Sequence, residues 1–137
     1  MAELTARQIE QLLDAAQRAS ERAYAPFSKF RVGAAILTQR GEIFSGCNVE
    51  NSSYGLTMCA ERTSIFAAVA AGALGADQSL VAVAVVNGEG APCSPCGACR
   101  QVIFEIGPEA VVIYRARGGE MAQMKAKELL PEGFRLR

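Results

Sequence analysis

Histidine is absent from the 137-residue sequence. Without histidine the chain cannot form a Ser-His-Asp triad or a Cys-His catalytic pair, because both use an imidazole as the general base. A metal site in this chain must therefore be built from thiolates and carboxylates. This absence restricts the mechanisms that the remaining residues can support.

The sequence also lacks an excess of charge of either sign. Its 14 lysines and arginines balance its 14 aspartates and glutamates, and the charged residues form no long runs. Proteins that bind nucleic acid usually carry basic surface that neutralises phosphates. The balanced charge therefore disfavours a nucleic-acid partner.

Long apolar runs are missing as well. The longest apolar stretches fall well short of the roughly 18 residues that a membrane-spanning helix requires. The N-terminus, Met-Ala-Glu-Leu-Thr, has no basic region followed by an apolar segment. We therefore expect a soluble cytoplasmic protein without a membrane partner.

Half of the residues are apolar, which is enough to build one core. A chain of this length is too short for two domains of ordinary size. It contains no internal repeat and no linker that would mark a boundary. We expect residues 1–137 to form a single domain.

The five cysteines indicate a metal site rather than a disulfide framework, because their number is odd and no secretory signal accompanies them. Cys96 and Cys99 follow Pro95, and residues three apart lie on one face of a first helical turn. Cys59 precedes a second segment of helical character, residues 60–71. Two helix N-termini can thus bring three thiolates to one zinc ion.

A zinc ion held by three thiolates leaves one net negative charge, which opposes ionisation of a bound water. Two helix N-termini, each carrying about half a positive charge, would offset that charge. We expect the guanidinium groups of Arg62 and Arg100 to contribute as well. Glu61 follows Cys59 by two residues and is therefore close enough to reach a water on the metal.

Other interpretations of these residues remain open. A Cys-x-x-Cys pair also occurs in structural zinc sites and in redox dithiols, and Cys93 has the spacing of a fourth ligand. Glu61 could be a solvated charge on a first helical turn, where acidic residues are favoured. Arg62 could be an ordinary surface ion-pair partner. Cys47 is expected to be a buried thiol without a chemical role.

The hydrophobic pattern predicts helices alternating with strands. Thr5 and Gln8 form a capping box for a first helix that ends before Pro26. The continuous apolar run from Leu80 is typical of a strand covered on both faces. The predicted helices cover residues 6–23, 60–71 (central and buried) and 96–107, and the predicted strands cover 30–37, 43–48, 80–86 and 110–114.

Three runs of sequence carry a resemblance to a known family: Cys59-Ala60-Glu61, Pro95-Cys96-Gly97-Ala98-Cys99 and the polar run from Cys47 to Leu56. With them the chain resembles the small, homotetrameric, zinc-dependent cytidine deaminases with three cysteine ligands, over residues 23–134. The resemblance implies an α/β fold of three layers, α/β/α, around a mixed sheet of about five strands. Residues 121–125, which could otherwise begin a helix, would be an edge strand.

The resemblance also implies one zinc ion per subunit, on Cys59, Cys96 and Cys99. Glu61 would be the catalytic residue, moving a proton from water to ring N3 and later to the departing amino group. Arg62 would hydrogen-bond the thiolates. The backbone N–H of Ala60 would donate to the pyrimidine carbonyl.

The remaining substrate contacts follow from the same resemblance. Asn48 and Glu50 would bind the ribose 3′-hydroxyl, and Phe27 would pack against the pyrimidine ring. From the residues alone, simple turn chemistry explains Asn48 and Glu50 equally well. Tyr54 and Phe134, otherwise ordinary aromatics, would reach the pocket of a neighbouring subunit, so that a homotetramer would share its active sites.

The expected activity is hydrolytic deamination of the nucleosides cytidine and 2′-deoxycytidine to uridine and 2′-deoxyuridine, with release of ammonia, as in pyrimidine salvage. Two alternatives remain. An aminohydrolase of a nucleoside antibiotic such as blasticidin S would share the metal and the acid, although the loop from Asn48 to Tyr54 resembles the cytidine enzymes. A non-enzymatic zinc-binding interaction module is the other alternative.

Overall fold

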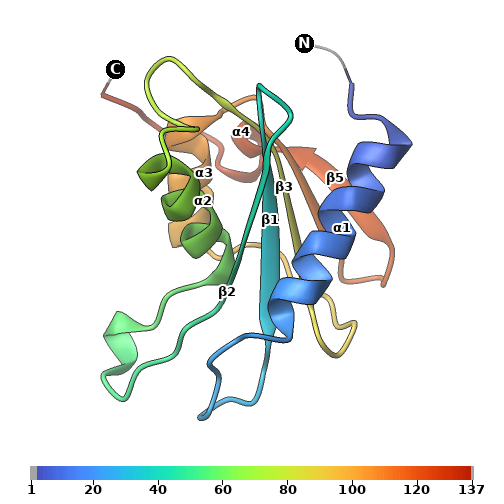
Figure 1. The fold of residues 1–137 in the computed structure, drawn as a ribbon, viewed down its shortest axis with the longest axis vertical. Helices are drawn as coiled ribbons and strands as arrows, with labels where there is room; N and C mark the ends of the chain where they lie inside the picture. The colour runs from blue at the N-terminus through green and yellow to red at the C-terminus, as the bar shows by residue number, and fades with distance from the viewer. Residues whose placement is uncertain (1–2, 137) are drawn as a thin grey trace.

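A computed structural model describes residues 3–136 and places helices on both faces of a five-stranded sheet (Figure 1). The strand order is β2-β1-β3-β4-β5, with β3 and β4 parallel and the other neighbours antiparallel. This arrangement confirms the predicted mixed α/β sheet. The elements are α1 (Ala6–Ser20), β1 (Val32–Thr38), β2 (Ile43–Cys47), the 3₁₀ helix η1 (Tyr54–Leu56), α2 (Ala60–Ala70), β3 (Leu80–Asn87), α3 (Gly97–Ile106), β4 (Val111–Arg115), β5 (Met121–Lys125) and α4 (Ala126–Leu129).

The central strand β3 is covered on both faces, as its continuous apolar run predicts. Val83 and Val85 point into the core beneath α2 and α3, which includes Ile65. Ala82 and its alternate neighbours point into the second core, beneath α1, which includes Leu12. Because successive side chains of a strand face opposite ways, the sheet separates two apolar layers. Within residues 3–136, no helix is long and apolar enough to cross a membrane.

Helix α1 begins as predicted and ends earlier. Thr5 Oγ1 accepts from the backbone N of Gln8 at 3.0 Å, and Gln8 Oε1 accepts from the backbone N of Thr5 at 2.9 Å, which confirms the capping box. The helix ends at Ser20 instead of Ala23. Beyond Ser20 the backbone N–H groups bond to carbonyls three residues back, as in a 3₁₀ turn. The predicted end was therefore three residues too late.

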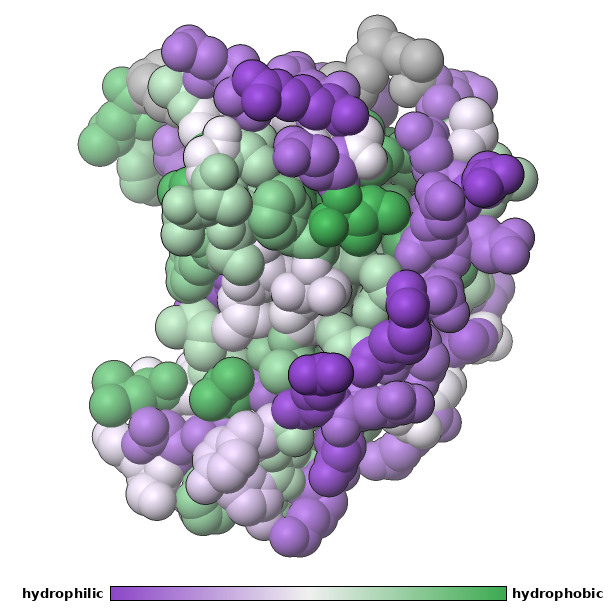
Figure 2. All heavy atoms as spheres, in the orientation of Figure 1, coloured by the Kyte–Doolittle hydropathy of each residue, from purple (hydrophilic) through white to green (hydrophobic). Residues whose placement is uncertain are grey.

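Helix α2 is buried on one face only, so the prediction of a wholly buried helix was wrong for the single chain. Ile65 is 1% exposed, whereas Phe66 is 46% and Val69 44% exposed on the outer face. Figure 2 shows apolar side chains gathered over the side of the molecule that carries α2, and hydrophilic side chains over α1. Apolar residues of a helix normally face a core, and here Phe66, Ala67, Val69 and Ala70 of α2 are exposed.

Two glycines allow the helices to lie directly on the backbone of the sheet. A Cβ on Gly33 would lie 1.9 Å from the carbonyl oxygen of Ala16 in α1. On the other face, a Cβ on Gly46 would lie 2.3 Å from Thr63 Oγ1 and 2.6 Å from the backbone N of Ser64 in α2. Any larger residue at either position must push its helix away from the sheet.

We predict that Gly33→Ala destabilises the protein, because the added methyl group overlaps the backbone of α1. Overpacking of this kind costs about 1–3 kcal/mol of unfolding free energy. The matched control is Gly88→Ala, since a Cβ at Gly88 meets nothing within 4 Å. Urea denaturation of both variants measures the difference, and equal stabilities would contradict the close packing of α1.

Candidate metal centre

Three cysteine thiols meet where α2 and α3 begin. Cys59 is the N-cap of α2, Cys96 is the N-cap of α3, and Cys99 lies in the first turn of α3. Their sulfur atoms all lie within 4.8 Å of one another. The prediction that two helix N-termini bring these thiols together is confirmed.

The separation of the sulfurs fits a tetrahedral zinc ion. Zn–S bonds of about 2.3 Å place two ligand sulfurs of a tetrahedral ion about 3.8 Å apart. The Sγ atoms of Cys59 and Cys96 are 3.8 Å apart. Within residues 3–136 no fourth cysteine or carboxylate joins the group, so Cys93 does not complete a closed structural site. Three protein ligands and one open position are typical of catalytic zinc.

The thiols also have the electrostatics of a cation site. The pKa of Cys59 is lowered to about 5, chiefly by a hydrogen bond from Cys99 and then by one from Arg62. That same bond and burial raise the pKa of Cys99, because a second thiolate beside the first is unfavourable. A cation between the thiols would favour the ionised form of both Cys59 and Cys99.

Arg62 contacts the thiols, and its part in offsetting their charge stays a prediction. Its Nη2 donates to Cys59 Sγ at 3.4 Å, and its buried Nε has no hydrogen-bond partner among residues 3–136. Arg100, the other predicted cation, makes its hydrogen bonds elsewhere. It donates to the carbonyl oxygens of Pro95 at 2.8 Å and Leu129 at 3.0 Å, so it ties the loop before α3 to the C-terminal segment.

Glu61 is buried beside the thiols and is not the solvated surface charge that the alternative interpretation required. Its side chain lies in the first turn of α2 and is 5% exposed. Burial raises the pKa of Glu61 to about 7. Its carboxylate does not belong to the group of sulfur atoms, which leaves it available to act on a molecule bound there.

A cavity of about 330 Å³ contains several of the predicted substrate contacts. Phe27, Glu50 and Tyr54 line it together with Ser28 and Thr57, which the sequence did not single out. The rings of Phe27 and Tyr54 meet edge to face, with centroids 6.1 Å apart. Phe134 is 68% exposed and does not line this cavity in its own chain, whereas Ala60 is fully buried at the start of α2.

Asn48 and Glu50 hold the segment before β1 in place. Asn48 Oδ1 accepts from the backbone N of Val32 at 2.9 Å, and Asn48 Nδ2 donates to the carbonyl of Phe30 at 2.9 Å. Glu50 Oε1 accepts from two backbone N–H groups of the same segment, and both side chains are 9% exposed. The turn chemistry considered for them is therefore present, and their contact with a substrate stays a prediction.

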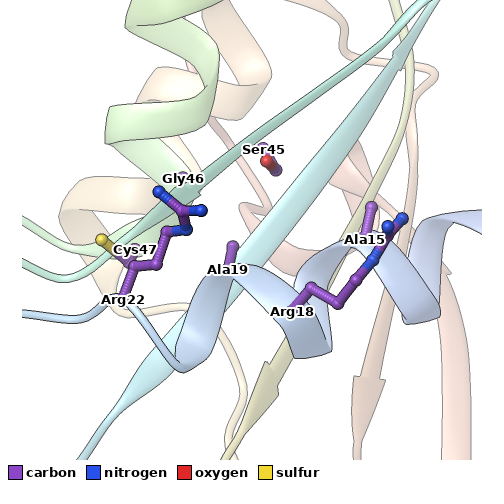
Figure 3. Close-up of a pocket in the computed structure, with 7 residues that line it drawn as sticks. All are labelled: Ala15, Arg18, Ala19, Arg22, Ser45, Gly46 and Cys47. Carbon is purple, nitrogen blue, oxygen red and sulfur yellow. The ribbon is translucent and has the colours of Figure 1, made fainter.

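A larger hollow of about 480 Å³ lies elsewhere, between α1 and β2. Figure 3 shows the guanidinium groups of Arg18 and Arg22 directed toward different ends of it, with Cys47 on the strand. None of the three clustered thiols lines this hollow, and neither does Glu61. Its arginines do not converge, so its size does not make it the site of the chemistry.

Comparison with known proteins assigns the family. Residues 6–115 match the family model described as the cytidine and deoxycytidylate deaminase zinc-binding region. The chain is 45% identical to a cytidine deaminase of Sporosarcina psychrophila, over 92% of this chain and 90% of that protein. The chain belongs to the cytidine deaminase family. The resemblance inferred from the three sequence runs is therefore confirmed.

Solved structures of cytidine deaminases have the same fold. The crystal structure of the enzyme from Burkholderia pseudomallei superposes with a TM-score of 0.83 and 47% identity, covering 96% of this chain and all (100%) of that one. The one from Mycobacterium tuberculosis gives a TM-score of 0.81 and 40% identity, covering 93% and 98%. The predicted cytidine deaminase-like fold is confirmed, and the three-cysteine group coincides with the zinc-binding region of the family.

We predict that Cys99→Ala abolishes zinc binding and lowers stability, because the ion links α2 to α3 and its binding energy contributes to folding. Elemental analysis of the purified protein measures zinc, and thermal unfolding measures stability. Cys93→Ala is the matched control and should keep its zinc. A full equivalent of zinc in Cys99→Ala would remove that residue from the ligand set.

Proposed function

We propose that this chain catalyses the hydrolytic deamination of cytidine and 2′-deoxycytidine to uridine and 2′-deoxyuridine, with release of ammonia. The observation that carries the proposal is a buried carboxylate, Glu61, beside three converging thiols with an open fourth position. The similarity to the cytidine deaminase of Sporosarcina psychrophila supports the choice of substrate. The loop from Asn48 to Tyr54, which resembles the cytidine enzymes, supports it too.

Cys59, Cys96 and Cys99 would hold the metal. Zinc, when bound, lowers the pKa of a water molecule and so supplies the nucleophile for hydrolysis. Arg62 offsets the charge of the thiolates through its bond to Cys59. The partial positive charges of the helix N-termini at Cys59 and Cys96 also offset the charge of the thiolates.

Glu61 would move the protons of the reaction. It takes a proton from the attacking water and delivers it to ring N3, which makes C4 more electrophilic as the C–O bond forms. It then takes the remaining proton from the hydroxyl added at C4 and delivers it to the amino group, so that the C4 carbonyl forms, the C4–N bond breaks and ammonia leaves. The burial of Glu61 supports this role, since a carboxyl group shielded from bulk water exchanges protons with the bound substrate and the attacking water.

Other residues would orient the nucleoside. Phe27 would pack against the pyrimidine ring, and Asn48 with Glu50 would bind the 3′-hydroxyl of the sugar. The Ala60 N–H would donate to the pyrimidine carbonyl, because the first N–H groups of a helix have no partner within it. The shared cavity of Phe27 and Glu50 supports this placement of the sugar and the base.

We predict that the zinc-loaded protein consumes cytidine, measured as loss of its ultraviolet absorbance, and that Glu61→Gln keeps zinc while losing turnover. The glutamine preserves size and removes proton transfer, which typically contributes about 10²–10⁴-fold. Glu10→Gln, an exposed position on α1, is the matched control. A zinc-loaded wild type without activity on either nucleoside would refute the proposed function, and near-normal turnover in Glu61→Gln would remove that residue from the mechanism.

We also propose a homotetramer of single-domain subunits, each formed by residues 1–137, with active sites shared between subunits. The outer face of α2 supports this, because Phe66 and Val69 lie exposed on the helix whose first turn carries Glu61. Tyr54 is 77% exposed beside the cavity, and Phe134 is 68% exposed near the C-terminus. A second copy of the chain would cover these apolar surfaces and complete the pocket.

We predict that a chain ending before Phe134 has a raised KM for cytidine and recovers activity in mixed oligomers. In a mixture with Glu61→Gln, some sites combine Glu61 from the truncated chain with Phe134 from the other, so activity should exceed the sum of the separate proteins. Removal of residues 136–137 alone is the control, and light scattering reports the oligomeric state. An unchanged KM in the truncated chain would contradict the shared site.

A further inference from the structure

Ser28 makes the shortest contact to Glu50 in the cavity. Its hydroxyl lies in hydrogen-bond contact with Glu50 Oε2, and its Oγ accepts from the backbone N of Phe30 at 3.0 Å. A serine hydroxyl carries a single proton. Because the N–H of Phe30 already donates to that oxygen, the hydroxyl proton is directed to the carboxylate of Glu50.

The turn that carries Ser28 has a fixed geometry. Lys29 adopts a φ of 63°, in the left-handed region that residues with a side chain rarely occupy. Its backbone N donates to the carbonyl of Ala25 at 3.0 Å. The two residues before Lys29 are also bonded, since the N–H groups of Phe27 and Ser28 donate to Glu50 Oε1 at 2.9 and 3.1 Å. The hydroxyl of Ser28 is therefore presented from a rigid backbone.

The number of donors limits what Glu50 can still bind. A carboxylate offers about four lone-pair positions. Two backbone N–H groups occupy Oε1 and the Ser28 hydroxyl occupies one position on Oε2, so one position remains. Asn48 uses one of its two amide N–H groups on the carbonyl of Phe30 and keeps one. One free acceptor and one free donor together match a single hydroxyl group.

We propose that Ser28 is a positioning residue that orients Glu50 and leaves its carboxylate with one acceptor position, for one sugar hydroxyl of the nucleoside. This inference rests on the proposed function. With this arrangement Glu50 would not recognise a 2′-hydroxyl, because no further acceptor position remains on its carboxylate after the 3′-hydroxyl is bound. The Ser28 hydroxyl also holds the pKa of Glu50 below its usual range, with smaller contributions from the backbone N–H groups of Ser28 and Phe27 and from the charge of Lys29. The carboxylate therefore stays an acceptor.

The test compares Ser28→Ala with wild type on three substrates: cytidine, 2′-deoxycytidine and 2′,3′-dideoxycytidine. We expect kcat/KM to fall about tenfold for the first two, since a hydrogen bond to a charged group is lost. The loss should lie in KM, because Glu50 does not touch the reacting C4 atom. The dideoxynucleoside lacks the 3′-hydroxyl that Glu50 is proposed to bind, so its kcat/KM should be the same for Ser28→Ala and wild type.

Two further variants complete the design. Ser28→Thr keeps the hydroxyl at an exposed position and should restore wild-type KM values. Ser45→Ala removes a hydroxyl from an exposed position of β2 and should have no effect on any of the three substrates.

The outcomes separate the two hypotheses. Equal losses on all three substrates would overturn the role of Ser28, because they would indicate a general structural effect. A loss confined to kcat would overturn it too, because Glu50 is proposed to act on binding. An unaffected Ser28→Ala variant would overturn it as well. In each of these cases the wild type still deaminates cytidine, so the proposed function stands. An inactive zinc-loaded wild type would refute both.

Discussion

The contact between the backbones of α2 and β2 is the constraint on which the site depends. Gly46 has no Cβ, so Thr63 and Ser64 lie directly on the strand, and the Thr63 hydroxyl donates to the Cys47 carbonyl at 2.9 Å. Because atoms in contact cannot approach further, this packing fixes the distance of α2 from the sheet. The first turn of α2, with Cys59 and Glu61, is fixed with it.

The same placement of α2 creates the electrostatics of the metal centre. The start of the helix directs its free N–H groups and its partial positive charge toward the thiols. One turn along, Arg62 reaches back to Cys59, while Glu61 points into the interior. One helix start therefore stabilises negative sulfur and, two residues away, disfavours a negative carboxylate through burial. These opposite effects on adjacent groups are what a site needs to bind a cation and still hold a proton.

Local patterns predicted much of this structure, and long-range contacts account for what they missed. The capping box of Thr5, the Cys96 and Cys99 spacing and the apolar run of β3 are properties of neighbouring residues, so the sequence reveals them. Cys59 joins the other thiols only through the fold; its position before a helical segment predicted the contact, and the family resemblance supported it. The bonds from Arg100 to Leu129 and from Ser28 to Glu50 join residues 22 or more apart in the sequence. The exposure of Phe66 depends on surfaces that another chain would cover. No periodicity encodes them.

The backbone of Val49 connects the two halves of the candidate site. It forms a two-way pair with Met58, with N–O distances of 2.9 Å, and Met58 directly precedes Cys59. The residues on either side of Val49 pair with Tyr24. The N–H of Glu50 donates to the carbonyl of Tyr24 at 2.8 Å, and the N–H of Tyr24 donates to the carbonyl of Asn48 at 3.0 Å. The residues proposed to hold the sugar are therefore tied to the residue proposed to hold the metal by main-chain bonds. Within the intervening loop, Thr57 Oγ1 also accepts from the backbone N of Asn51 at 3.2 Å. An insertion between Asn48 and Cys59 that broke the pairing of Val49 with Met58 would separate sugar from metal.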